Sequence, residues 1–147
     1  SITFLINQSI TTAMLPDDWK FARVTPVFKG KGSKTDKSNY RPISVLSYIS
    51  CILEKEVQCQ IMDFFIKHNY ISMDQFAFLK NHSTATCLHR VVDDWYEALN
   101  ESEMIRVCFL DIQKCFDTID HDILLTKLDK YGISGNELKW FKDYMSQ

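Results

Sequence analysis

The stretch FLDIQKCFDTIDHDIL, residues 109–124, carries four aspartates at close spacing. The first of them, Asp111, follows the mostly apolar run Val107–Leu110, so we expect it where a buried strand leaves a sheet. A carboxylate there is costly unless it binds something, and Mg²⁺ is normally held by one or two carboxylates plus substrate phosphates. The residues alone leave two roles open for Asp111, a metal ligand and a structural carboxylate.

The other three aspartates, Asp117, Asp120 and Asp122, are interpreted as turn and helix-start residues. Carboxylates at a helix start accept hydrogen bonds from free N–H groups and interact favourably with the helix dipole. A calcium loop is excluded, because an EF-hand needs oxygen ligands at loop positions 3 and 5 and glycine at position 6. Counted from Asp111, those positions hold Gln113, Cys115 and Phe116.

A basic segment over residues 20–41 is a second chemical feature. It has seven cations and one carboxylate, a balance of 7 − 1 = +6, in a chain of net charge −2. A local polyanion site and a merely solvated loop are both open interpretations of this segment. The cations are Lys20, Arg23, Lys29, Lys31, Lys34, Lys37 and Arg41, and the carboxylate is Asp36.

The elements that position these residues follow from apolar periodicity. Helices are predicted over 2–13, 48–68 with Ser47 as N-cap, 83 or 84 to 99, 120–131 and 134–146. Strands are predicted over 21–28, 43–46 and 105–112, with a polar, glycine-bearing loop at 30–39. This order predicts a mixed α/β (α+β) domain.

Cysteine usage and hydropathy bear on the compartment. The five cysteines show no zinc-site spacing, and four lie among apolar residues, which predicts reduced, buried thiols. Charged residues interrupt every apolar run, and a secretory leader is not apparent, so we expect an intracellular chain with no membrane partner. Nucleus and cytoplasm are not distinguished, and the oligomeric state is unknown. Both ends look cut, since the chain starts at Ser1 and stops without a helix-ending signal.

Five segments occur in an order typical of one family. They read LPDDWKFARVTPVFKGKG, SNYRPISVLSYISCILEKE, DQFAFLKNHSTATCLHRV, FLDIQKCFDTIDHDILLTKL and YGISGNELKWFKDYMSQ. Together they resemble the N-terminal part of the reverse transcriptase domain of non-LTR (LINE-type) retrotransposons, over nearly the whole chain. The resemblance implies an incomplete right-hand polymerase, with the fingers over residues 1–104 and the start of the palm over 105–147.

The resemblance also implies site roles near the aspartate cluster. Asp111 matches the aspartate that binds both catalytic Mg²⁺ ions, for which Mn²⁺ is a possible substitute, and Ile112 would lend its backbone carbonyl to one ion. Phe116 matches the aromatic residue that excludes a ribose 2′-hydroxyl, although a core role is the alternative. Two such ions activate the primer hydroxyl and stabilise the leaving pyrophosphate.

Further roles are implied in the fingers. Lys29 and Arg41 match the residues that hold the incoming deoxynucleoside triphosphate, and Arg offers phosphate a planar fork whereas Lys acts as a point charge. Gln75 and Phe76 match a segment that lies along the template and under the new base pair. The expected partners of the complete protein are an RNA template, a DNA primer and deoxynucleoside triphosphates. Lys31, Lys34 and Lys37 are expected at the template backbone or in solvent.

Some positions depart from the family pattern. Ala77 and Leu79 stand where the family usually has glycine and arginine, and Cys115 replaces the usual alanine. The VVDD stretch at 91–94 superficially resembles the second catalytic motif, aromatic-x-Asp-Asp, but precedes Asp111 and lies in a predicted helix. No such motif follows Asp122, so the chain alone is expected to be inactive. The alternatives are a non-catalytic remnant that binds RNA or RNA–DNA hybrid, and a decayed coding fragment without function.

Overall fold

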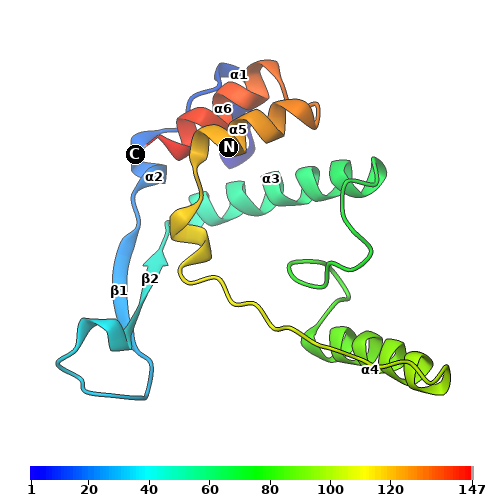
Figure 1. Ribbon diagram of the computed structural model, residues 1–147. Helices are drawn as coiled ribbons and strands as arrows, with labels where there is room; N and C mark the ends of the chain where they lie inside the picture. Colours follow the sequence, from blue (N-terminus) through cyan, green and yellow to red (C-terminus); the bar gives the residue numbers. More distant parts are fainter. Residues whose placement is uncertain (147) are drawn as a thin grey trace. The chain divides into compact units, whose positions relative to one another are not determined.

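The computed structural model describes residues 1–146, which form a mostly helical α+β fold with one two-stranded antiparallel sheet (Figure 1). By Cα proximity the chain divides into two units. The first comprises residues 1–64 and the chain from Ile119, and the second comprises residues 65–118. The elements are α1 (Ile2–Thr12), α2 (Asp17–Lys20), β1 (Arg23–Phe28), η1 (Lys37–Asn39), β2 (Tyr40–Val45), α3 (Tyr48–Lys67), α4 (Thr84–Asn100), η2 (Cys115–Thr118), α5 (His121–Lys130) and α6 (Gly135–Met145).

The core of the first unit lies between α1, α3 and α6. Ile6, Leu15, Leu53 and Trp140 form its buried cluster, and Leu53 in α3 is 1% exposed. The predicted helix over 48–68 is confirmed as Tyr48–Lys67, and Ser47 begins it as predicted, because its hydroxyl accepts from the Ser50 N–H at 3.2 Å. The helices predicted over 2–13, 120–131 and 134–146 are confirmed as α1, α5 and α6.

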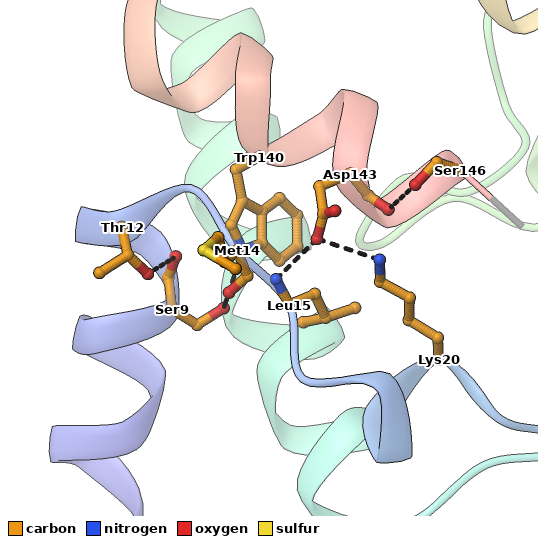
Figure 2. Close-up of polar contacts among 8 residues, drawn as sticks. All are labelled: Ser9, Thr12, Met14, Leu15, Lys20, Trp140, Asp143 and Ser146. Atoms are coloured by element: carbon orange, nitrogen blue, oxygen red, sulfur yellow. Dashed lines mark hydrogen bonds and ion pairs between the residues drawn. The ribbon is translucent and has the colours of Figure 1, made fainter.

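Polar contacts fasten the N-terminal segment to α6 (Figure 2). The Trp140 Nε1–H donates to Ser9 Oγ at 3.0 Å, and Ser9 Oγ donates to the Met14 carbonyl at 2.6 Å. One turn further along α6, the Asp143 carboxylate accepts from the Leu15 N–H at 2.7 Å and pairs with Lys20 Nζ at 3.1 Å. These contacts satisfy the polar atoms of Ser9 and Trp140 where they are buried.

Strands β1 and β2 form a hairpin whose register pairs Phe28 with Tyr40 and Pro26 with Pro42. Beyond the pairs of the ladder, the Lys29 N–H donates to the Asn39 carbonyl at 2.8 Å. Bonded and non-bonded pairs alternate in an antiparallel ladder, so the two prolines face each other at a non-bonded position. The sequence tolerates proline there because its missing N–H is not needed between the strands.

The second unit contains α4, and Ser83 is its N-cap, one of the two residues expected at the helix start. The Thr86 N–H donates to Ser83 Oγ at 3.2 Å, and the Ser83 N–H donates to Thr86 Oγ1 at 2.8 Å, so the two residues form a capping box. None of the α4 residues is buried. The VVDD stretch lies in this helix as predicted, and its aspartates Asp93 and Asp94 are exposed, with Asp94 paired to Arg90 at 3.2 Å.

The predicted strand over 105–112 is wrong for this structure. Residues 104–112 form no strand, and Phe109 and Leu110 are 87% and 89% exposed. A strand is stable only when its N–H and C=O groups pair with a neighbour, and β1 and β2 are the only paired strands in residues 1–146. The backbone of this segment therefore has no neighbouring strand to pair with, although its residue types favour a strand.

The predicted burial of the cysteines is also wrong. All five are free thiols, but Cys51, Cys59, Cys108 and Cys115 are exposed and Cys87 is half-buried. A cysteine with apolar neighbours in the sequence is buried only if another part of the chain packs against that side of its helix or segment. Within residues 1–146, no helix is both long and apolar enough to cross a membrane.

Candidate functional site

The hairpin places Lys29 and Arg41 on one face. Arg41 is paired with Val27, and Lys29 with Asn39 through its N–H. Directly paired residues share a face and side chains alternate along each strand, so Lys29 and Arg41 are diagonal neighbours on the same side. Both side chains are exposed, and Lys29 Nζ donates to the Ser38 carbonyl at 2.7 Å.

The loop between the strands is tied by its own side chains, which the sequence analysis did not anticipate. The Asp36 carboxylate accepts from the Ser38 N–H at 2.9 Å, Asn39 Nδ2 donates to the Ser33 carbonyl at 2.9 Å, and the Tyr40 hydroxyl donates to the Lys34 carbonyl at 2.8 Å. The bonds from the Ser38 backbone and side chain, with the charge of Lys29, lower the pKa of Asp36. The spacing Asp-x-Ser, typical of an aspartate that caps a turn, is the one sequence signal for this arrangement.

In the second unit, Gln75 and Phe76 lie in a turn-rich segment before α4. Gln75 Nε2 donates to the Ala77 carbonyl at 3.3 Å, and the half-buried Phe76 ring lies 5.5 Å from the His82 ring, edge to face. Phe78 has a φ of +63°, a conformation that side chains with a Cβ rarely adopt. Its side chain is 73% exposed.

The residues around the first aspartate of the cluster are exposed as well. Asp111 and Ile112 lie in the strandless segment, and Phe116 lies in η2 with 70% of its surface exposed. The Phe116 ring contacts Phe78 edge to face, with ring centroids 5.9 Å apart. Phe116 is thus not a core residue here, and sequence reasoning missed Phe78 as its neighbour. The only sequence signal was an aromatic residue two positions after Phe76.

Of the other aspartates, Asp120 begins α5 as predicted. Its carboxylate accepts from the Asp122 and Ile123 N–H groups at 2.9 and 3.0 Å. Asp122 occupies the first turn of α5, and Asp117 the 3₁₀ turn η2. The helix-start interpretation is confirmed for Asp120 and Asp122 and agrees with the turn position of Asp117.

The donor set for magnesium is incomplete in the described part of the chain. The Asp111 carboxylate and the Ile112 carbonyl are oxygen donors of the kind that Mg²⁺ prefers, but this ion requires near-octahedral coordination. Residues 1–146 contain no group of three or more His, Cys, Asp or Glu placed to hold a metal. The chemistry of these donors therefore suits Mg²⁺, but one carboxylate and one carbonyl do not hold two such ions without further ligands.

A cavity of about 500 Å³ in the first unit offers no such chemistry. It lies between α3 and α6 and is lined by Val57, Ile61, Trp140 and Phe141 among others. At its rim the Tyr144 hydroxyl donates to Glu54 Oε1 at 2.6 Å, and burial together with this carboxylate raises the pKa of Tyr144. None of the residues predicted for the site lines this cavity.

Comparisons with known proteins agree on one family. Residues 30–147 match the sequence model of the family described as "Reverse transcriptase (RNA-dependent DNA polymerase)". The chain is 28% identical over 129 residues to a probable RNA-directed DNA polymerase from transposon BS of Drosophila melanogaster, covering 88% of the chain and 14% of that protein.

Two further relatives come from the same species. The probable RNA-directed DNA polymerase from transposon X-element is 30% identical over 127 residues, and the RNA-directed DNA polymerase from mobile element jockey is 32% identical over 126 residues. Each match covers 86% of the chain and 14% of the relative. The chain thus spans about one seventh of the length of the curated relatives that it matches.

Proposed function

This chain belongs to the reverse transcriptase family and is related to the polymerases of non-LTR retrotransposons, and on that premise we propose that it is part of an RNA-directed DNA polymerase. Residues 1–104 would supply the fingers and residues 105–147 the start of the palm. The substrates of the complete protein would be an RNA template, a DNA primer and deoxynucleoside triphosphates. The observation that carries the proposal is the basic hairpin, whose loop and second strand lie in the matched residues 30–147 and which has Lys29 and Arg41 on one face.

Lys29 and Arg41 are proposed to hold the triphosphate. A guanidinium binds phosphate oxygens through two parallel N–H groups, and a lysine beside it adds a compact charge. In the structure the Lys29 ammonium donates to the Ser38 carbonyl. Because that contact is exposed, an incoming phosphate can replace the carbonyl as acceptor at little cost, and the ammonium binds an anionic phosphate oxygen more strongly than a neutral carbonyl.

Asp111 and Ile112 are proposed to contribute oxygen ligands to the catalytic metal. The family generally uses Mg²⁺, and such ions supply charge stabilisation and activation of a hydroxyl in nucleotidyl transfer. Asp111 is a single carboxylate for two ions, so a further carboxylate would come from another part of the complete polymerase, with substrate phosphates and water as the remaining ligands. Under this proposal the 147-residue chain by itself does not synthesise DNA.

Phe116 is proposed to lie beside the sugar of the incoming nucleotide, with Gln75 and Phe76 along the template and the new base pair. The edge contact from Phe78 supports the Phe116 ring from one side and leaves most of its surface exposed. An apolar ring at that position would leave a ribose 2′-hydroxyl without a hydrogen-bond partner, which disfavours ribonucleotides.

The test uses a longer protein that contains this chain and an aromatic-x-Asp-Asp motif. Primer extension on an RNA template with Mg²⁺ or Mn²⁺ is measured for the unmodified protein, for Asp111→Ala and for Asp117→Ala as the matched control. We expect Asp111→Ala to abolish synthesis and Asp117→Ala to retain it. Normal synthesis by the Asp111→Ala protein would show that the metal ligand is misassigned.

A second function is supported by the exposed cations of the hairpin, namely a non-catalytic chain that binds RNA or RNA–DNA hybrid through them. Affinity of the 147-residue chain for an RNA oligonucleotide should then fall with salt, and Lys29→Ala and Arg41→Ala should each weaken it. Binding that depends neither on salt nor on these residues would rule this function out.

A further inference from the structure

The loop Lys29–Tyr40 of the hairpin is held in one conformation by bonds within itself. Three side chains bridge it from separate positions, Asp36 to Ser38, Asn39 to Ser33 and Tyr40 to Lys34. The Tyr40 ring also packs on Phe28 with centroids 5.4 Å apart, which anchors the bridge to the end of the ladder. Loops of exposed polar residues are usually mobile, and this one is tied at both ends and in the middle.

Gly32 belongs to the same arrangement. Its φ is +81°, and a Cβ built on it would lie 2.5 Å from Asn39 Nδ2. The Asn39 amide that bonds Ser33 therefore occupies the space that a side chain at position 32 would need. Gly30 has nearly the same φ, +77°, but nothing within 4 Å of a Cβ.

The tied backbone carries Lys31, Lys34 and Lys37. All three are exposed, and none of them makes an ion pair in the described part of the chain. The backbone of Lys34 is fixed because its carbonyl accepts from the Tyr40 hydroxyl. Lys37 is the first residue of the turn η1, and Asp36 caps that turn. The bridges thus fix where Lys34 and Lys37 leave the backbone, and Lys31 lies next to Gly32, which packs against the bridging Asn39 amide. The three side chains stay free to reach a ligand.

We propose that Asp36, Asn39 and Tyr40 are positioning residues that pre-organise this loop so that Lys31, Lys34 and Lys37 bind the phosphate backbone of a nucleic-acid strand. The proposal rests on the proposed function and adds residues that do not touch the strand themselves. Binding costs less when the groups that bind are already ordered, so the bridges raise affinity without adding charge. The lysines determine how many counterions are released, which sets the slope of affinity against salt.

The experiment measures binding of the 147-residue chain to a fluorescent single-stranded RNA oligonucleotide over a range of salt concentrations. Tyr40→Phe removes one bridge and keeps the ring on Phe28, and Tyr48→Phe is the matched control because Tyr48 is 91% exposed. We expect Tyr40→Phe and Asn39→Ala to weaken binding about 2- to 10-fold, the equivalent of one hydrogen bond each, with the salt slope unchanged. Lys34→Ala should instead lower the slope by about 0.7, the value for one phosphate contact on a single strand.

The two glycines provide a second, independent comparison. Gly30→Ala and Gly32→Ala impose similar backbone strain, but only Gly32→Ala displaces the Asn39 amide. Gly32→Ala is therefore expected to weaken RNA binding at least 3-fold more than Gly30→Ala. Far-ultraviolet circular dichroism and thermal unfolding establish that each variant is folded, and amide exchange of residues 33–39 reports whether the loop has loosened.

The outcomes separate this proposal from the proposed function. If Lys34→Ala lowers the salt slope while Tyr40→Phe, Asn39→Ala and Gly32→Ala bind like the unmodified chain, positioning is wrong and nucleic-acid binding stands. If Lys34→Ala leaves both affinity and slope unchanged, the loop lysine does not bind nucleic acid and the further inference fails, whereas the proposed function depends on Asp111→Ala in primer extension. A loosened loop with unchanged affinity also overturns the positioning role.

Discussion

Asp143 joins two segments that lie far apart in the sequence, since its carboxylate accepts from the Leu15 N–H and pairs with Lys20. The Leu15 bond, followed by Lys20, lowers the pKa of Asp143 below its ordinary value of 3.8. The unfolded chain binds the proton more readily than the folded one, so this contribution to stability is present above pH 3.8 and is lost as pH falls through the lowered pKa.

Asp143→Ala tests this contribution. We expect the free energy of unfolding at neutral pH to fall by about 1 kcal/mol, a value kept small because the Asp143 side chain is partly exposed to solvent. The difference from the unmodified chain should shrink when pH falls below 3.8. Urea unfolding at several pH values measures it, and a difference that grows in acid would contradict the assignment.

Ser9 has a comparable role in the interior. Ser9→Ala would leave both the buried Trp140 N–H and the Met14 carbonyl without their present partner. We expect a loss of about 1–3 kcal/mol, the cost of a buried polar group left unpaired. Ser146→Ala removes only the exposed bond to the Asp143 carbonyl, so it should lower the free energy of unfolding by only a fraction of the loss in Ser9→Ala. Thermal or urea unfolding measures both variants. Equal effects of the two changes would show that burial is not the cause.

Among the elements, α5 depends on Asp120, the residue that caps its N-terminus. Asp120→Ala removes the acceptor for two N–H groups at the start of the helix, which typically costs about 1 kcal/mol. Asp117→Ala, outside the helix in η2, is the matched control and should have a smaller effect. Amide exchange of residues 121–124 is the direct readout, and unchanged protection in Asp120→Ala would contradict the cap.

Helices and strands differ in what the sequence reveals of them. The helices were predicted because their bonds run between residues four apart and their apolar stripes repeat every turn, as in α3 from Ile49 to Phe64. The segment 105–112 has strand-forming residues, but its pairing depends on a partner that periodicity does not specify. Likewise, residue types and motif order indicated Lys29, Arg41 and Asp111, whereas the bridges from Asn39 and Tyr40 depend on loop geometry.

On the scale of the whole molecule, the two units differ in how much they bury. Every buried hydrophobic residue of the described chain, from Ile6 to Trp140, belongs to the first unit. A region with few buried apolar contacts opens at low free-energy cost. The candidate site residues Gln75, Phe76, Asp111, Ile112 and Phe116 all lie in the second unit.

This difference predicts where the chain opens first. Amides of residues 104–113 should exchange near the rate of an unstructured peptide, whereas those in the middle of α3 and α6 should be protected. Limited proteolysis should first cut within the same exposed segment. Hydrogen exchange followed by mass spectrometry measures both regions in one experiment, and strong protection of 105–112 would restore the strand expected there.

The facing pair Pro26 and Pro42 has a consequence for how the hairpin meets other chains. At a non-bonded position the backbone of each residue points away from its partner, toward the outer edge of its own strand. Each edge therefore lacks an N–H in its middle, where an added strand would need one. An exposed strand edge is a template for aggregation, and proline on the edge is a known protection against it. Pro26 and Pro42 thus leave the pairing of β1 with β2 intact and disfavour the addition of a third strand. The basic hairpin therefore remains accessible to other ligands.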